Sequence, residues 1–361
     1  MQTFRLLICA FLVVGGVSGS AQGSDWSRVM PLPTAPPVAF LLPRNPIYRQ
    51  IFDSVSKDRI DTLLQQLSGS LPVAIGDKTY SISDRYLPDS KAKFRAFWMQ
   101  YFRDLGLAVQ ELDYPTCHRI GESQGHNLEA VLPGKSPNSV VIIVHYDSIG
   151  PDGHEASNPG VDDDMSGMAT MMETARILVE HKALLQNTVR FVAADYEEQD
   201  NPGLEGARQY ASFIKNLAAG DHFEILKAID DEQSGWNCTH DHRCGVDPQH
   251  CPSDTTSATF DVFSSSCDRK YNYPDLGDSL AQVALEYDSL SVGRYCINPN
   301  SDHYAMWEIG VPAVVFSEHG PFCNPHFDQN GGDTYDKIDP DYYFKIARIG
   351  VTFAAVTVGL E

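Results

Sequence analysis

The stretch NPGVDDDMSG, residues 158–167, places three consecutive aspartates between a Pro-Gly turn and a Ser-Gly pair. Like charges on neighbouring residues repel each other, so either water or a cation must hold three carboxylates in one short loop. Water would make the loop an ordinary solvated turn. A cation would make it part of a metal site.

Metal-ligating side chains also follow four predicted strands. The strands and the residues after them are 139–144 with His145 and Asp147, 188–194 with Glu197 and Glu198, 223–229 with Asp230, and 312–317 with His319, His326 and Asp328. Because ligands gather at the carboxyl ends of strands in an open α/β sheet, these side chains should converge with the three aspartates. A single histidine after a strand is usually a capping or core residue, but coincidence at every strand end is a poor explanation.

Convergence of this kind favours a bound metal over a solvated turn. Carboxylates that cluster without compensation raise each other's pKa values and cost several kcal/mol, and a divalent cation removes the repulsion. Imidazole nitrogen together with carboxylate oxygen suits zinc. A carboxylate that bridges two ions also suits manganese or cobalt.

Alternating strands and helices must position these side chains. Expected strands cover 139–147, 188–198, 223–230, 259–264 and 312–318, and expected helices cover 48–68, 90–105, 166–181, 206–217, 275–289 and 340–358. The run SVVIIVHYD at 139–147 is apolar and β-branched, as in a buried parallel strand. The pattern predicts an α/β fold, with a mainly parallel central sheet flanked by helices, in one catalytic domain over residues 48–361.

The first 47 residues predict export. Residues 1–21 have one arginine, a short apolar run and a small-residue end, as a secretory signal peptide does. Residues 22–47 are rich in proline and should form an extended arm. Because no later segment has 18 uncharged apolar residues, we expect a secreted or periplasmic protein without stable membrane insertion.

Net charge and cysteine content further limit the classes of protein to which the chain could belong. The formal net charge of −21 argues against nucleic-acid binding, which needs a basic surface. Seven cysteines remain after the leader, and several staple an insertion at about 236–258. In an oxidising compartment disulfides are favoured there over a zinc knuckle, and Cys117 is the candidate for a free thiol.

The order of the motifs resembles that of a known enzyme family. HYD, PGVDDDMSG, YEE followed by GLEGAR, AID, SDH and NPHFDQNGGDTYDKID occur in the order found in the dinuclear zinc aminopeptidases of peptidase clan MH, of the secreted leucyl aminopeptidase type. The resemblance covers roughly residues 125–355 and extends more weakly over 48–130. It implies a zinc exopeptidase fold of the phosphorylase/hydrolase-like kind, two zinc ions, and peptide or protein N-termini as substrate.

The resemblance also implies a ligand set. His145 and Asp230 would bind one zinc ion, and Glu198 and a late histidine would bind the other. Asp162, the first of the three aspartates, would bridge both ions. Its bond to Asp163 would be a cis peptide.

Other residues would orient the ligands. Asp147 would accept a hydrogen bond from the non-ligating nitrogen of His145 and fix its tautomer. Asp302 and His303 of the SDH motif are expected to have a supporting role.

Glu197 would be the general base. A water between two zinc ions loses its proton near neutral pH and becomes a hydroxide nucleophile, and a nearby carboxylate takes the proton and passes it to the leaving amine. Adjacent Glu197 and Glu198 could divide base and ligand between them if the chain has left regular strand geometry there.

The sequence departs from the family in two places. His326 is followed by Asp333-Thr334 at a longer spacing than the family shows, and anchoring on Asn-Pro instead puts Asp328 at the ligand position. His326 is favoured because imidazole is the family ligand. The insertion at about 236–258 and the QDNP segment after Glu198 should reshape the substrate pocket.

Several alternatives stay open. Glutaminyl cyclases share the fold and the HYDS stretch but use one zinc ion, and the aspartate run together with the intact Glu-Glu pair favours the dinuclear hydrolase. A carboxypeptidase or dipeptidase of the same clan is a second alternative. A catalytically inactive binding relative is a third.

Overall fold

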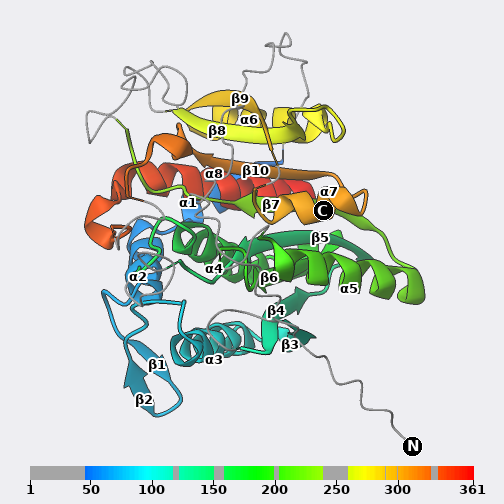
Figure 1. Cartoon of the computed structure of the whole chain (residues 1–361). Coiled ribbons are helices and arrows are strands. Elements are labelled where there is room, and N and C mark those ends of the chain that lie inside the picture. The colour runs from blue at the N-terminus through cyan, green and yellow to red at the C-terminus, as the bar shows by residue number, and fades with distance from the viewer. Residues whose placement is uncertain are drawn as a thin grey trace, which may run out of the picture.

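A mixed eight-stranded sheet forms the centre of the molecule (Figure 1). The computed structural model describes residues 45–116, 122–149, 158–198, 203–238, 259–288, 290–298, 300–326 and 332–361. The strand order is β3-β4-β6-β5-β7-β10-β8-β9. The bounds are β3 Ala108–Pro115, β4 Gln124–Leu132, β5 Ser136–His145, β6 Asn187–Ala194, β7 Ile225–Asp231, β8 Thr259–Ser266, β9 Ser291–Ile297 and β10 Ala313–Glu318.

The four central strands β6, β5, β7 and β10 are parallel to one another. Antiparallel pairing occurs between β3 and β4, between β4 and β6, and between β10 and β8. The predicted α/β fold with a mainly parallel sheet is therefore confirmed. Because parallel strands end on the same side, the carboxyl ends of β5, β6, β7 and β10 meet at one edge.

Alternation along β5 divides the core into two layers. Val140, Ile142 and Val144 face one apolar cluster, whereas Val141 and Ile143 face the other. Side chains of successive strand residues point to opposite faces, so a strand buried on both sides is apolar throughout. This explains the continuous apolar run that marks β5 in the sequence.

Helices cover both faces of the sheet (Figure 1). The first cluster holds residues of α1 Pro46–Ser54, α2 Lys57–Leu67, α3 Pro88–Asp104, α4 Met165–Glu180, α6 Pro274–Tyr287 and α8 Pro340–Val358. The second holds residues of α5 Glu205–Asp221 and α7 His303–Glu308. Short elements complete the fold: the hairpin β1 Val73–Ile75 with β2 Lys78–Tyr80, and the 3-10 turns η2 Lys182–Leu184, η3 Pro321–Cys323 and η4 Tyr335–Lys337.

The N-terminal part differs from the expectation in three ways. The single helix expected over 48–68 is two helices, because the hydroxyl of Ser56 caps a new helix by accepting from the amide of Arg59. α1 begins at Pro46, inside the range expected for the extended arm, and residues 1–44 lie outside the described part. The antiparallel strands β3 and β4 were not expected.

Disulfides link the described cysteines. Cys267, just after β8, is bonded to Cys296 of β9. Cys238 and Cys323 are also disulfide-bonded, and both pack against Trp236. Cys117, Cys244 and Cys251, with residues 239–258 of the predicted insertion, lie outside the described residues.

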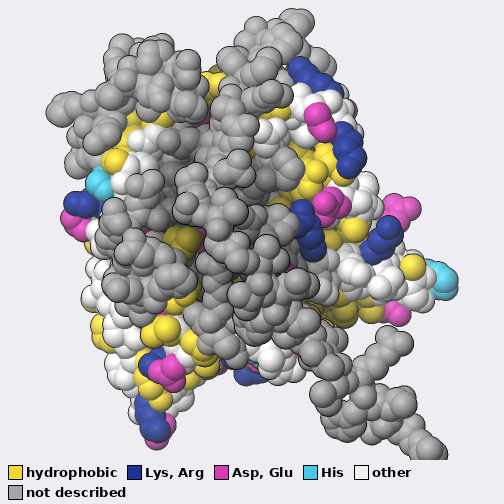
Figure 2. All heavy atoms as spheres, viewed as in Figure 1, with side chains coloured by type: hydrophobic (Ala, Val, Ile, Leu, Met, Phe, Trp, Pro, Cys, Tyr) yellow, Lys and Arg dark blue, Asp and Glu magenta, His cyan; other side chains and the backbone are white. Residues whose placement is uncertain are grey.

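Two surface properties complete the description. Among the helices that the structure describes, none is long and apolar enough to cross a bilayer. On the described part of the face in Figure 2, acidic and basic side chains are interspersed with apolar ones.

Candidate metal centre

Asp163, the middle residue of the aspartate run, faces His145. Its Oδ1 lies 2.9 Å from Nε2 of His145, and its Oδ2 accepts a hydrogen bond of 2.8 Å from the amide side chain of Gln233. Asp163 therefore presents a carboxylate to the residue that ends β5. The cis peptide bond joins Asp163 to Asp164, one residue later than expected.

Asp162, the predicted bridging ligand, has other partners. Its Oδ1 accepts from the amide of Gly235 at 2.6 Å, and its Oδ2 accepts from the side chain of Asn324 at 2.7 Å. The buried carboxyl group of Glu318 is also a neighbour. Burial, together with the charge of Asp162, raises the pKa of Glu318 well above its usual value. The structure thus places the Asp162 carboxylate among supporting contacts, and Asp163 takes the position facing His145.

The third aspartate connects the loop to α4. Oδ1 of Asp164 accepts from the amide of Gly167 at 3.0 Å and caps the helix. Its Oδ2 is buried and has no hydrogen-bond partner among the described residues.

The loop is fixed from a distant part of the chain. The carboxylate of Asp333 accepts from the amides of Asp162 and Asp163, at 2.8 and 2.9 Å. Because two backbone groups share one carboxylate, the register of the aspartate run is set by a residue 170 positions away.

His145, the last residue of β5, is fully buried. Its Nδ1 lies 3.1 Å from the backbone oxygen of Asp147, which can only accept a hydrogen bond, so Nδ1 carries a proton. The Asp147 carboxylate is farther away, at 3.7 Å. The tautomer that was expected from the carboxylate is thus set by the backbone carbonyl, and Nε2 points at the site.

The carboxylate of Asp147 holds the two glutamates after β6. It accepts from the amide of Glu197 at 2.9 Å and from that of Glu198 at 3.1 Å. The preceding residue, Tyr196, has a left-handed φ of 59°, and β6 ends at Ala194. The chain has therefore left strand geometry before the pair, as a division of roles between the two glutamates requires.

Glu198 joins the centre formed by His145 and Asp163. One ligand atom from each of these three residues lies within 4.8 Å of the other two. Glu197 and Glu198 are both half-buried. The structure thus brings Glu198, a predicted ligand that follows β6, close to His145 at the end of β5.

Glu232, directly after β7, lies next to His145, whereas the side chain of Asp230 has other partners. Oε1 of Glu232 lies 3.4 Å from Nε2 of His145. Oδ2 of Asp230 instead accepts from the Ser301 hydroxyl at 2.9 Å and from the backbone amide of His303 at 3.0 Å. Ser301 also donates to Oε2 of Glu232, at 2.6 Å. Sequence reasoning missed Glu232, whose only signal is its position directly after the strand.

Burial and mutual repulsion perturb the acids of this centre. Burial, with His145 in opposition and Asp163 and Asp230 adding repulsion, raises the pKa of Glu232 to about 8. Burial, together with the charges of Glu232 and Asp302, also raises the pKa of Glu197 well above its usual value. Burial alone would lower the pKa of His145, but Glu232, Asp147 and Asp163 together raise it.

This donor set fits a divalent metal. Nε2 of His145 faces oxygens of Asp163 and Glu232, which only accept when they are ionised, so a proton or a cation must lie between these groups. A second group of potential ligands combines His145, Asp164 and Glu232. Imidazole and carboxylates are the ligands that zinc takes in catalytic sites, and a cation would relieve the raised pKa values.

The described residues do not show which side chain supplies the late ligand. His326 is half-buried, and its amide donates to the side chain of Asn324 at 2.9 Å, but it is absent from the described metal-ligand groups. Asp328 lies outside the described residues. His319, after β10, is paired through Nδ1 with Asp261 at 2.7 Å.

Arg85 links the end of β5 and the aspartate loop to helix α2. This fully buried guanidinium donates to the backbone oxygens of Tyr146, Gly160 and Leu67, at 2.8, 3.0 and 3.3 Å. Gly160 has a φ of +54°, and a Cβ there would lie 2.4 Å from the guanidinium. Glycine is therefore required at this contact on both conformational and steric grounds.

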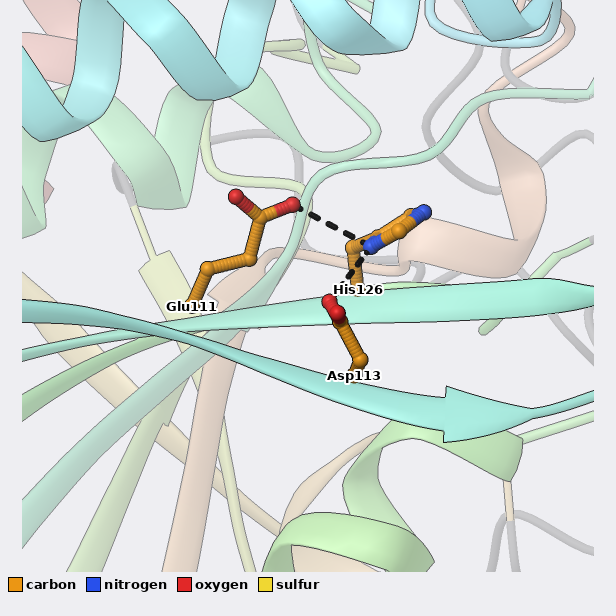
Figure 3. Close-up of side chains that lie close together, drawn as sticks. All are labelled: Glu111, Asp113 and His126. Atoms are coloured by element: carbon orange, nitrogen blue, oxygen red, sulfur yellow. Dashed lines mark hydrogen bonds and ion pairs between the residues drawn. The ribbon is translucent and has the colours of Figure 1, made fainter.

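A third group of potential ligands lies on the sheet away from this centre. Glu111 and Asp113 of β3 point toward His126 of β4, with their oxygens 3.1 and 2.8 Å from its Nδ1 (Figure 3). Arg95 also pairs with Glu111, at 3.0 Å. A protonated imidazole and a guanidinium thus already compensate these carboxylates.

Comparison with known proteins shows which proteins the chain is similar to. Residues 127–237 match the model of peptidase family M28. A probable leucine aminopeptidase of Arthroderma otae is 27% identical over 292 residues, which cover 76% of this chain and 73% of the relative.

Solved structures with the same fold include two kinds of enzyme. The LapA aminopeptidase of Legionella pneumophila aligns with a TM-score of 0.65 at 18% identity, over 88% of this chain and 76% of that chain. BSAP, a zinc aminopeptidase of Bacillus subtilis, gives 0.61 at 14% identity, over 84% and 98%. A glutaminyl cyclase of Fimbriiglobus ruber gives 0.63 at 18% identity, over 84% and 96%.

Proposed function

We propose that the protein is a metal-dependent aminopeptidase of peptidase family M28, which removes N-terminal residues from peptides at a centre of two zinc ions. The observation that carries the proposal is the meeting of His145, Asp163, Glu198 and Glu232 at the carboxyl ends of β5, β6 and β7. Manganese or cobalt would suit the same oxygen and nitrogen donors.

The proposed ligands differ from the sequence-based set at two positions. Asp163 replaces Asp162 as the carboxylate between the two ions, because the Asp162 oxygens are taken by Gly235 and Asn324. Glu232 replaces Asp230 because Asp230 is directed to Ser301 and His303.

His145 and Glu232 would hold one ion and Glu198 the other. His326 stays the proposed late ligand on the side of Glu198, with Asp328 as the alternative.

Zinc ions bound at such a centre supply Lewis acidity toward the scissile carbonyl and lower the pKa of water. Glu197 is the proposed general base, which takes the proton of the attacking water and returns it to the leaving amine as the C–N bond breaks. Burial, followed by Glu232 and Asp302, raises the pKa of Glu197, and bound cations would lower it again so that the carboxylate could accept the proton.

Asp147 keeps the base and the adjacent ligand apart. One carboxylate receives the amides of both Glu197 and Glu198, so the two side chains leave the backbone from a fixed turn. Asp147 is thus proposed to position both glutamates, in addition to supporting His145 through its backbone oxygen.

Metal content and product identity test this function. We expect close to two zinc ions per chain, release of chromophore from leucyl p-nitroanilide, loss of that activity on chelation and its return when zinc is added. Absence of aminoacyl release from the zinc-loaded protein would reject the aminopeptidase.

A glutaminyl cyclase is the second candidate, because a cyclase structure aligns as well as the aminopeptidases do. One zinc ion per chain, together with conversion of N-terminal glutamine to pyroglutamate, would favour it. We also propose that the chain is exported with a cleaved leader over residues 1–21, and N-terminal sequencing of the secreted protein would test this.

A further inference from the structure

A lysine occupies a core position in helix α3. Lys91 lies three and seven residues before Phe94 and Trp98, on the helix face that packs against the sheet, and its side chain is fully buried. Three- and seven-residue spacing places side chains on one face of a helix, where an apolar residue is usual. Burying an ammonium is costly unless it is paired, so its partners define its role.

The partners of Lys91 belong to the turn after β6. Its Nζ lies 2.6 Å from Oδ1 of Asp195 and 3.5 Å from the centroid of the Tyr196 ring. A cation over an aromatic face is attracted to it, and the attraction strengthens when both are removed from water. Lys91 thus holds the two residues directly before Glu197.

A second carboxylate completes the arrangement. Nζ of Lys91 lies 3.1 Å from Oε2 of Glu122, and the same oxygen accepts a hydrogen bond from the Tyr196 hydroxyl. The ring of Tyr196 is therefore fixed at its face by Lys91 and at its hydroxyl by Glu122.

Asp195 is held equally firmly. Its Oδ2 accepts from the amide of His126 at 3.1 Å, and its own amide donates to the side chain of Asn127 at 3.0 Å. The Tyr196 amide donates to Oδ1 of Asp195, the oxygen that Lys91 contacts. Lys91 is therefore the cation at the centre of a network that surrounds this turn.

The turn needs such support because Tyr196 is left-handed. A φ of 59° is unfavourable for a residue with a bulky side chain and persists only when its surroundings fix it. A relaxed turn would rotate the two following residues relative to Asp147, to which both donate.

We propose that Lys91 is a positioning residue of the reaction, which fixes the Tyr196 turn and thereby aims Glu197 and Glu198. The inference rests on the proposed function, because it assigns Glu197 and Glu198 their roles as base and ligand. Lys91 lies outside the segment that matches the family model and touches none of the proposed ligands through a contact described above.

Lys91→Met tests the role, because methionine keeps the length of the stem and removes the charge. We expect kcat to fall about 10- to 100-fold, as for a misaimed catalytic group, with KM for leucyl p-nitroanilide changed by less than about threefold. The absorption spectrum of the cobalt-substituted protein should also change, since Glu198 is a proposed ligand. Lys93→Met is the matched control, because Lys93 lies two residues along the same helix and pairs with Asp89 at the surface.

A kcat and a cobalt spectrum in Lys91→Met that match those of Lys93→Met would overturn the proposal, even if the melting temperature falls. If Lys91→Met does not fold, Lys91→Arg decides by the same readouts, because arginine keeps the charge but cannot place a single ammonium on the ring and both carboxylates. Failure of the proposed function is distinguishable, since the wild-type protein would then release no amino acid.

Discussion

Oε1 of Glu232 lies 3.4 Å from Nε2 of His145, across the neighbouring carboxyl ends of β7 and β5. Asp230, two residues earlier, shares the donor Ser301 with Glu232 but has its remaining contacts with His303. The two acids thus have different places at the end of one strand, and only Glu232 reaches the imidazole.

This difference predicts unequal losses of zinc affinity for two matched substitutions. Glu232→Gln should weaken zinc binding by more than about 100-fold, because it removes a proposed direct ligand. Asp230→Asn should weaken it by about 10- to 100-fold, as expected for a group that only supports a ligand through Ser301. Zinc titration against a competing chelator measures both. Stronger loss in Asp230→Asn would restore Asp230 as the ligand.

Glu197→Gln should separate base from ligand. The amide cannot accept a proton, so kcat should fall by about 10² to 10⁴ while the zinc content stays near that of the wild type. Stopped-time assays with leucyl p-nitroanilide and metal analysis of the same preparation check both parts. Undiminished turnover would remove Glu197 as the base.

The late ligand is decided by His326→Ala against Asp328→Ala. We expect His326→Ala to lose close to one of the two zinc ions, because imidazole is a common zinc ligand in hydrolases. Asp328→Ala should keep both ions. The reverse pattern would assign the ligand to Asp328. Two zinc ions in both variants would leave neither residue as a ligand.

Arg85 should contribute strongly to stability. Arg85→Met leaves the carbonyls of Tyr146, Gly160 and Leu67 without their buried donor, and should lower the free energy of unfolding by at least about 3 kcal/mol. Arg85→Lys should recover only part of this, because one ammonium cannot reach three divergent carbonyls. Urea unfolding of the three proteins measures the difference, and a fully stable Arg85→Met would contradict the interpretation.

The His126 cluster of Figure 3 predicts a pH dependence of stability. A hydrogen bond to Glu111, opposed by burial and assisted by Asp113, raises the pKa of His126 above its usual 6.5. The folded state therefore binds this proton more tightly. The stabilisation is fully present below pH 6.5 and is lost as the pH rises through the raised pKa.

His126→Gln should therefore cost about 0.5 kcal/mol near pH 6 and less near pH 9, since partly exposed pairs are screened. Urea unfolding at the two pH values measures this. The control is His222→Asn, at an exposed left-handed position where asparagine is tolerated. An equal loss at both pH values would assign the effect to packing.

Periodicity made the central elements predictable from the sequence. The apolar run of β5 and the amphipathic patterns of α4, α5 and α8 are local signals, and each element was expected within a few residues of its bounds. β3 gives no such signal, because most of its residues are exposed or half-buried and its apolar residues do not alternate. It is placed by pairing with β4 rather than by its own pattern.

The register of the proposed ligands could not be predicted in the same way. Three adjacent aspartates are equivalent in sequence, and the choice between Asp162 and Asp163 depends on Asp333, which is far away in the chain. After β7, the choice between Asp230 and Glu232 depends on where the strand ends and on Gln233, whose φ is 53°. Contacts with residues far away in the chain therefore determine which aspartate of the run, and which acid after β7, faces His145.

The placement of Arg85 and Lys91 has a practical consequence for engineering. Both residues precede position 127, where the match to the family model begins, yet one is bonded to the backbone of the aspartate loop and the other to the turn before the glutamates. A fragment trimmed to residues 127–237 would lack both side chains. It would bury the carbonyls of Tyr146 and Gly160 without their donor, and Asp195 without its cation. Chimeras with related peptidases should therefore exchange the whole segment from α2 through Arg85 to α3 together with the catalytic loops.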